Sequence, residues 1–162
     1  MDEHVESRWR FTPFLVLALG MLTSCIDEEA GVLLSAELES PALTVASSAL
    51  VTEVTGDFAI ELSLGDRASD ATTVELGTFS LQRDGDVLLN PLELDAEPAF
   101  PITVGVGGKK SVAVTIGPQE ADAEIADSLC SGQLQVVGTL TDSLGDDRPL
   151  TLSSVSFSPA CE

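Results

Sequence analysis

The stretch FAIELSL, residues 58–64, decides the fold class, because large apolar side chains alternate along it with small or polar ones. A period of two residues places the four large apolar side chains on one face and the residues between them on the other. An amphipathic helix would instead repeat its apolar residues every three or four positions. The stretch therefore predicts a β-strand with one buried face.

Short runs of the same kind recur along most of the chain, separated by turn residues. Asp84-Gly85 favours a tight hairpin because both residues adopt positive φ readily, and Gly107-Gly108 joins a second pair of runs. The apolar parity changes across Gly77, which predicts a β-bulge. Besides residues 58–64, the predicted strands cover residues 50–54, 74–81, 87–94, 102–106, 112–116, 134–140 and 150–157.

This pattern predicts an all-β protein. Only residues 118–129, PQEADAEIADSL, have a helix-forming composition, and we expect a short helical turn there. Many short strands favour an antiparallel sandwich, and the region resembles the immunoglobulin-like and fibronectin type III domains of bacterial surface proteins. The resemblance implies an immunoglobulin-like β-sandwich of about eight or nine strands. A β-barrel is the alternative architecture.

Size and charge limit the class of function. The chain has 162 residues, a length that suits a single domain. Asp and Glu number 27 against 7 Lys and Arg, which gives a formal net charge of −20. Such a charge repels nucleic acid phosphates, so no nucleic-acid partner is expected. Because 44% of the residues are hydrophobic, the composition is that of a folded chain and not of a disordered one.

The N-terminal region is expected to be a targeting signal. Residues 11–22 are apolar and follow Arg8 and Arg10, and this length suits the core of a signal peptide but falls short of the roughly 20 residues that span a bilayer. The segment ends in Leu22-Thr23-Ser24-Cys25, which resembles the lipobox of bacterial lipoproteins. The resemblance implies cleavage before Cys25, attachment of diacylglycerol to its thiol and acylation of the freed amine. Acyl chains then hold the protein, since each buried methylene contributes about 0.8 kcal/mol.

The lipobox resemblance also implies a location. In many Gram-negative bacteria an aspartate directly after the cysteine favours retention in the inner membrane, and here Ile26 takes that position. We therefore expect a cell-envelope protein that is lipid-anchored in the outer membrane of a Gram-negative bacterium. Two alternatives stay open, namely a free Cys25 buried at the end of a core helix and a cleaved signal without lipid.

Three segments follow from these signals. Residues 1–24 form the expected lipoprotein signal peptide, and residues 41–162 form the expected β-sandwich domain. Residues 25–40 are rich in acidic side chains and end before Pro41. They are expected to form an acidic tether, with at most one loosely paired strand.

Cys130 and Cys161 are expected to form a structural disulfide. Export would place both thiols in an oxidising compartment, where paired cysteines of a small domain are usually bonded. A redox or zinc pair is disfavoured, because no CxxC spacing occurs and the only histidine is His4, within the signal peptide. In the chain-entropy model, such a bridge stabilises the fold by roughly 3 to 4 kcal/mol.

The spacing of these cysteines supports the same pairing. Their midpoint lies in residues 142–149, the expected loop between the last two strands. A change of apolar parity further predicts a bulge near Ser153 and Ser154. In an antiparallel hairpin centred on that loop, the expected partners are Leu134 with Phe157, Val136 with Val155, and Cys130 with Cys161.

No catalytic residue is predicted. After removal of the signal no histidine remains to act as the base of a Ser-His-Asp set, and Lys109 and Lys110 lie in an expected hairpin turn. The chain has no Tyr, and its one Trp, Trp9, precedes Cys25, so platforms for sugar stacking are lacking. Two acidic clusters offer hard oxygen ligands for calcium, although neither has EF-hand spacing. They are Asp142, Asp146 and Asp147, and Glu120, Asp122 and Glu124.

The sequence therefore predicts a non-enzymatic interaction or adhesion module. Its expected partners are a membrane, reached through the N-terminal lipid, and a protein of unknown identity; no cofactor and no metal site are predicted. The alternative is a calcium- or carbohydrate-binding module on the same scaffold. A carboxylate-based hydrolase is a third and much weaker hypothesis.

Overall fold

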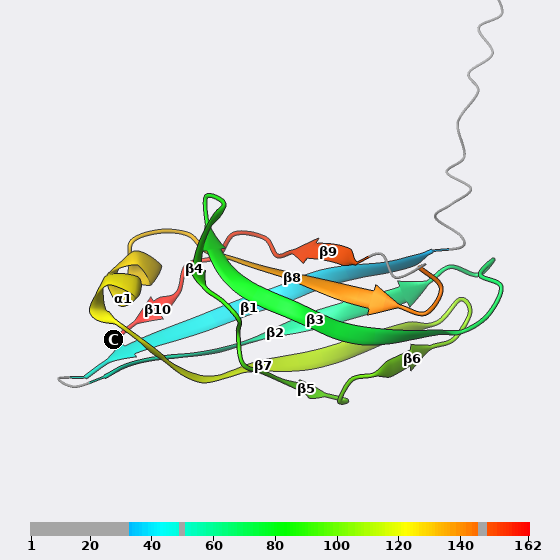
Figure 1. The fold of residues 1–162 in the computed structure, drawn as a ribbon, viewed down its shortest axis with the longest axis horizontal. Coiled ribbons are helices and arrows are strands. Elements are labelled where there is room, and N and C mark those ends of the chain that lie inside the picture. The colour runs from blue at the N-terminus through cyan, green and yellow to red at the C-terminus, as the bar shows by residue number, and fades with distance from the viewer. Residues whose placement is uncertain (1–32, 49–50, 146–148) are drawn as a thin grey trace, which may run out of the picture.

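A computed structural model describes residues 33–48, 51–145 and 149–162, and it places two β-sheets face to face (Figure 1). Sheet A has the strand order β10-β1-β2-β7-β5, and sheet B has the order β4-β3-β8-β9, with β6 pairing on β3. The predicted all-β sandwich is confirmed. Its elements are β1 (Leu34–Ser47), β2 (Thr52–Leu64), β3 (Thr72–Arg83), β4 (Asp86–Leu89), β5 (Leu94–Glu97), β6 (Ile102–Val104), β7 (Lys109–Ala121), α1 (Ala123–Cys130), β8 (Gln135–Asp142), β9 (Leu150–Ser153) and β10 (Ala160–Cys161).

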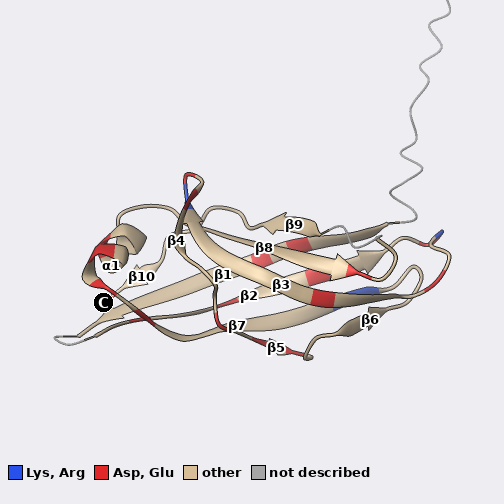
Figure 2. Ribbon diagram, viewed as in Figure 1, with Lys and Arg blue, Asp and Glu red and all other residues tan. Residues whose placement is uncertain are grey.

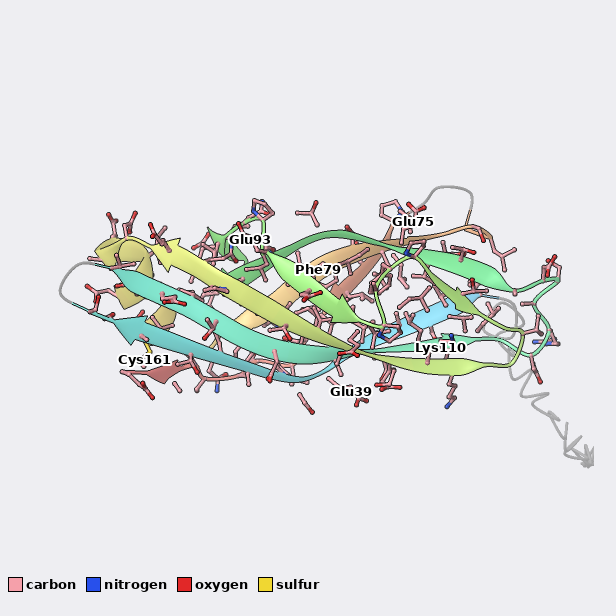
Figure 3. All side chains as sticks on the ribbon, turned by 90° about the horizontal axis from the view of Figure 1, so that it is seen from below. Glu39, Glu75, Phe79, Glu93, Lys110 and Cys161 are labelled. Carbon is pink, nitrogen blue, oxygen red and sulfur yellow. A yellow bond between two sulfur atoms is a disulfide. The ribbon has the colours of Figure 1, made fainter. Side chains whose placement is uncertain are left out.

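The core lies between the two sheets and follows the predicted alternation. The rings of Phe58 from sheet A and Phe79 from sheet B stack with centroids 5.7 Å apart. Figure 3 shows Phe79 between the layers, with Glu39 and Glu75 on opposite outer sides of the molecule. Gly138 leaves room for this ring, because a Cβ there would lie 2.2 Å from Phe79 Cδ1. A single apolar layer therefore joins the sheets.

Strand β1 begins at Leu34, before the boundary expected at Pro41. Residues 34–39 pair with residues 59–64 of β2, so this part of the expected acidic tether belongs to the sheet. Apolar residues alternate with Ser35, Glu37 and Glu39, which point outward into water and are compatible with an edge strand. The register shift between Glu39 and Ala42 then keeps the later apolar side chains of β1 facing the core.

The two runs at residues 50–54 and 58–64 are one strand in the structure. Strand β2 passes continuously through Thr55, Gly56 and Asp57, with a register shift against β7 between Val54 and Gly56. A bulge carries the chain through a glycine that looks like a strand break in the sequence. The bulge predicted at Gly77 is confirmed by the register shift between Leu76 and Phe79.

The run at residues 87–94, predicted as one strand, is divided between the sheets. β4 belongs to sheet B and β5 to sheet A. Pro91 lies between them and cannot donate to a strand ladder. Leu92 is only 7% exposed, and its N–H donates to the carbonyl of Phe79 over 2.8 Å. The chain thus crosses from one layer to the other at this point, and the single-strand prediction is wrong.

The predicted hairpin of β8 and β9 is present, with a different register at its end. Leu134 and Phe157 form an antiparallel bridge as predicted. The predicted facing of Val136 and Val155 is wrong, because the N–H of Val136 donates to Ser154 Oγ over 3.0 Å. The N–H of Ser154 in turn donates to the Val136 carbonyl over 2.9 Å, and Val155 is 70% exposed. The irregularity predicted near Ser154 is therefore where the register changes.

Candidate functional site

The cysteine predicted to carry lipid, Cys25, lies outside the described residues, as does the whole of Leu22-Thr23-Ser24-Cys25. Lipidation therefore stays a prediction. Within the described parts of the chain, no helix is both long enough and apolar enough to span a membrane.

The structure joins Cys130 and Cys161 by a disulfide, with their Cα atoms 6.1 Å apart. The pair is the one predicted, but the two residues are not partners in the β8–β9 hairpin. Cys130 ends α1, and Cys161 belongs to β10, which pairs in parallel with β1. Both cysteines are exposed, so the bridge lies at the surface and fixes the C-terminal segment to the end of the helix.

Helix α1 begins later than predicted and has a defined cap at each end. The Asp122 side chain accepts a hydrogen bond from the N–H of Ile125 over 2.8 Å, as an N-cap residue does. At the C-terminal end Arg83 donates to the carbonyl of Ser128 over 2.7 Å and to Ser131 Oγ. A cation there also complements the helix dipole.

In each of the two acidic clusters considered for calcium, one described carboxylate has a structural partner. Asp142 Oδ1 accepts hydrogen bonds from the Thr72 hydroxyl over 3.0 Å and from the N–H of Leu144 over 2.9 Å. Asp146 and Asp147 lie outside the described residues. In the second cluster, Asp122 is the N-cap of α1. Among the described side chains, no group of three or more His, Cys, Asp or Glu is placed to hold a metal ion.

The best candidate for a binding site is an open groove of about 780 Å³ on the outer face of sheet A. This groove is not among the sites predicted from the sequence. Three adjacent strands and the C-terminal segment contribute to its lining. They are residues 41–44 of β1, residues 55–57 of β2, residues 115–118 of β7, and Ser158 and Ala160 of the C-terminal segment. We call this surface the groove.

Two register irregularities form the hollow. One lies in β1 between Glu39 and Ala42, and the other lies where β2 meets β7, between Val54 and Gly56. Bulges bend a strand and increase its local twist. Gly56 allows β1 and β2 to approach closely, since a Cβ there would lie 2.4 Å from the Ala42 carbonyl oxygen. Bent backbone therefore forms the floor of the groove.

Small side chains keep the groove open. Thr44 pairs with Thr55 across β1 and β2, and Asp57 pairs with Thr115 across β2 and β7. Gly117 anchors the β7 side, where its N–H donates to the carbonyl of Glu93 over 2.9 Å. The lining thus offers hydroxyl groups, peptide groups and one carboxylate as hydrogen-bonding partners.

Carboxylates surround the groove. Asp57 lies within it, and Asp95 of β5 is directly opposite Thr115. Beyond its two sides lie the exposed side chains of Glu39 and Glu53. Figure 2 shows the acidic residues distributed over the strands of this sheet.

The described basic residues lie elsewhere in the molecule. Arg83 contacts α1, Lys109 pairs with Ser63 at the opposite end of β7, and Lys110 follows it, while Arg67 lies in the connection after β2. Figure 3 shows Lys110 far along the sheet from the Cys161 end. In the lining itself no lysine, histidine or cysteine accompanies the hydroxyl groups. The described lining therefore consists of hydroxyl groups, peptide groups, small apolar side chains and the carboxylate of Asp57.

One sequence signal could have indicated the groove. A glycine inside an alternating strand pattern, as in Thr55-Gly56-Asp57, indicates a bulge or a close approach of backbone. The runs on both sides of Gly56 keep the same apolar parity, which fits one continuous strand. The neighbours that complete the groove come from distant parts of the chain.

No protein-family model matches this chain, and neither curated proteins nor solved structures give a match. The resemblance to immunoglobulin-like domains therefore stays a prediction of fold family, while the two-sheet sandwich is a property of the structure.

Proposed function

We propose that this chain is a non-enzymatic interaction protein of the cell envelope, lipid-anchored through Cys25, and that the groove is its docking surface for a protein partner. The observation that carries the proposal is the groove itself, an open hollow on a sheet face whose lining offers small polar side chains and peptide groups. Protein–protein interfaces carry about one hydrogen bond per 100–200 Å², so exposed hydroxyl and peptide groups suit recognition of another protein.

The position of the groove along β1 supports the proposal. Thr44 lies ten residues after Leu34, and at about 3.3 Å per residue this separates the groove from the start of the sheet by about 30 Å. The proposed anchor, Cys25, precedes Leu34 in the sequence. The groove then occupies the part of the domain farther from the anchor, where a partner has access to it. The lipobox resemblance assigns this anchor to the outer membrane of a Gram-negative bacterium.

A photo-crosslinking experiment in the organism of origin tests the docking surface. A benzophenone amino acid is placed at Thr115, which is exposed in the groove, or at Thr151, an equally exposed threonine on β9 of the other sheet. The proposal predicts a discrete crosslinked species from position 115 and none from position 151. Crosslinking of both positions to the same extent, or of position 151 alone, would contradict it.

Intact mass spectrometry of the native protein tests the anchor. The proposal predicts a chain that begins at Cys25, carries acyl chains and lacks two hydrogens because of the disulfide. A mass equal to that of the unprocessed, reduced 162-residue chain would remove both the anchor and the envelope location.

A further inference from the structure

We infer that the occupant of the groove is an extended segment of a partner protein that carries lysine or arginine side chains. This inference rests on the proposed function, since it names the chemistry of the partner that docks in the groove. It is argued from the shape of the groove and from the charges that surround it.

The shape favours an extended chain that lies across the strands. The lining reaches from the C-terminal segment beside β10, over β1 and β2, to β7. Three inter-strand spacings of about 4.8 Å make this about 14 Å, the length of roughly four residues of extended peptide. The backbone groups of β1 and β2 are used in their own ladder. An occupant therefore rests on side chains and does not add a strand to the sheet.

The floor suits the backbone of such a segment. Ala42, Thr44 and Thr55 are small, so a peptide can approach the sheet closely, and threonine hydroxyls both donate and accept hydrogen bonds. A sugar ring would normally stack on an aromatic side chain, and the described part of the lining contains none. A peptide fits this chemistry better than a glycan does.

The carboxylates in and beside the groove favour a partner segment with basic side chains. Asp57 lies in the groove, Asp95 is adjacent to it across Thr115, and none of the described residues that line the groove is basic. Side chains of a basic peptide crossing β2 and β7 would approach both carboxylates. An acidic or phosphorylated segment would be repelled by the same groups and by the charge of the whole chain.

Binding of defined peptides to the full chain tests the inference. The probe is a fluorescent octapeptide of alternating lysine and threonine, and the comparison peptide has glutamate in place of lysine. The D57N/D95N variant should bind the lysine probe about five to ten times more weakly, because it removes two exposed ion pairs, each of which contributes modestly to binding.

The matched control is E37Q/E61Q, which removes the same formal charge from the same sheet face. Glu37 lies directly opposite Glu61, and Glu61 is four residues, about 13 Å, along β2 from Asp57. That separation exceeds the screening length of about 8 Å at physiological salt, so the control should weaken binding by less than about twofold. Equal losses in the two variants would show attraction to net charge alone and would overturn the inference. So would a preference for the glutamate peptide, a glycan or calcium.

The crosslinked partner separates failure of this inference from failure of the proposed function. If position 115 captures one partner and the contacting peptide, identified by fragmentation, contains lysine or arginine next to the crosslink, both stand. If that peptide is acidic or uncharged, the groove is still a docking surface and only the inference about the partner's chemistry is wrong. A failure to crosslink at position 115 combined with no binding of the lysine probe would overturn both.

Discussion

The two faces of sheet A consist of the same strands and follow the same alternation, but they differ in what they require of each residue. On the inner face Ile60 and Val112 are fully buried and pack against sheet B. On the outer face their neighbours Ala59 and Glu61 contact solvent in part. The inner face fixes the fold, and the outer face is free to carry a groove and its charges. The comparison can be tested by changing one face at a time.

The largest effect is expected on the inner face. Ile60→Ala should lower the free energy of unfolding by about 2–5 kcal/mol, because it removes buried methyl and methylene groups and leaves a cavity. The adjacent outer change Ala59→Ser should alter it by less than about 0.5 kcal/mol. Urea unfolding of both variants measures the difference. Similar losses in the two variants would show that the outer face is packed as tightly as the inner one.

A comparable loss is expected when the covalent link at the end of sheet A is removed. The C130S/C161S variant should lose roughly 3–4 kcal/mol in the chain-entropy model, since the bridge closes a loop with a sequence separation of 31 residues. Reduction of the unaltered protein should lower its stability by a similar amount. Thermal unfolding with and without a dithiol reductant checks both. An unchanged midpoint in both experiments would contradict a structural role for the bridge.

Gly56 lines the groove, and a side chain at this position would also meet the buried Leu43. Its substitution should therefore have an intermediate effect on stability. Gly56→Ala brings a Cβ within 2.4 Å of the Ala42 carbonyl oxygen and 3.0 Å of Leu43 Cδ1, which should destabilise by about 1–3 kcal/mol. Gly117→Ala is the control in the same groove, because the nearest atom to its Cβ would be 3.7 Å away. Chemical denaturation should separate the two variants. Equal stabilities would mean that β1 and β2 are not in close contact at Gly56.

The smallest effect concerns charge on the outer face away from the groove. Glu37 and Glu61 are direct cross-strand neighbours, and like charges at such positions repel each other. Glu37→Lys should raise the free energy of unfolding by about 0.2–1 kcal/mol, with the gain reduced in high salt. Denaturation at two salt concentrations measures it. A loss of stability at low salt would contradict the register of β1 on β2.

The strands could be predicted from the sequence because burial on one face imposes a period of two, as in residues 58–64. Strand β1 is not among the predicted strands, because Glu37 and Glu39 suggest a solvated tether that holds at most one loosely paired strand, although Leu38 between them is apolar. The exchange of sheets around Pro91 depends on a hydrogen bond from Leu92 to Phe79, a contact that local pattern does not encode.

The cysteine pair was predicted correctly, but from a hairpin that does not extend to it. Cys130 reaches Cys161 through α1 and the parallel pairing of β10 with β1. Gly56 indicates a local bulge, but the groove as a whole could not be predicted, because its sides come from residues 41–44, 55–57 and 115–118, which only the sheet register brings together. The alternation of apolar residues along a strand predicts which of its faces is buried. A site on a sheet face depends in addition on which strands lie beside one another.

The most direct test of the central claim is a nuclear magnetic resonance titration of the isotope-labelled chain with the alternating lysine–threonine peptide. If the groove on sheet A is the docking surface, amide shifts should change at Thr44, Thr55, Thr115 and Gly117 and stay unchanged on β8 and β9. Shifts confined to sheet B, or scattered over all acidic positions, would contradict the account.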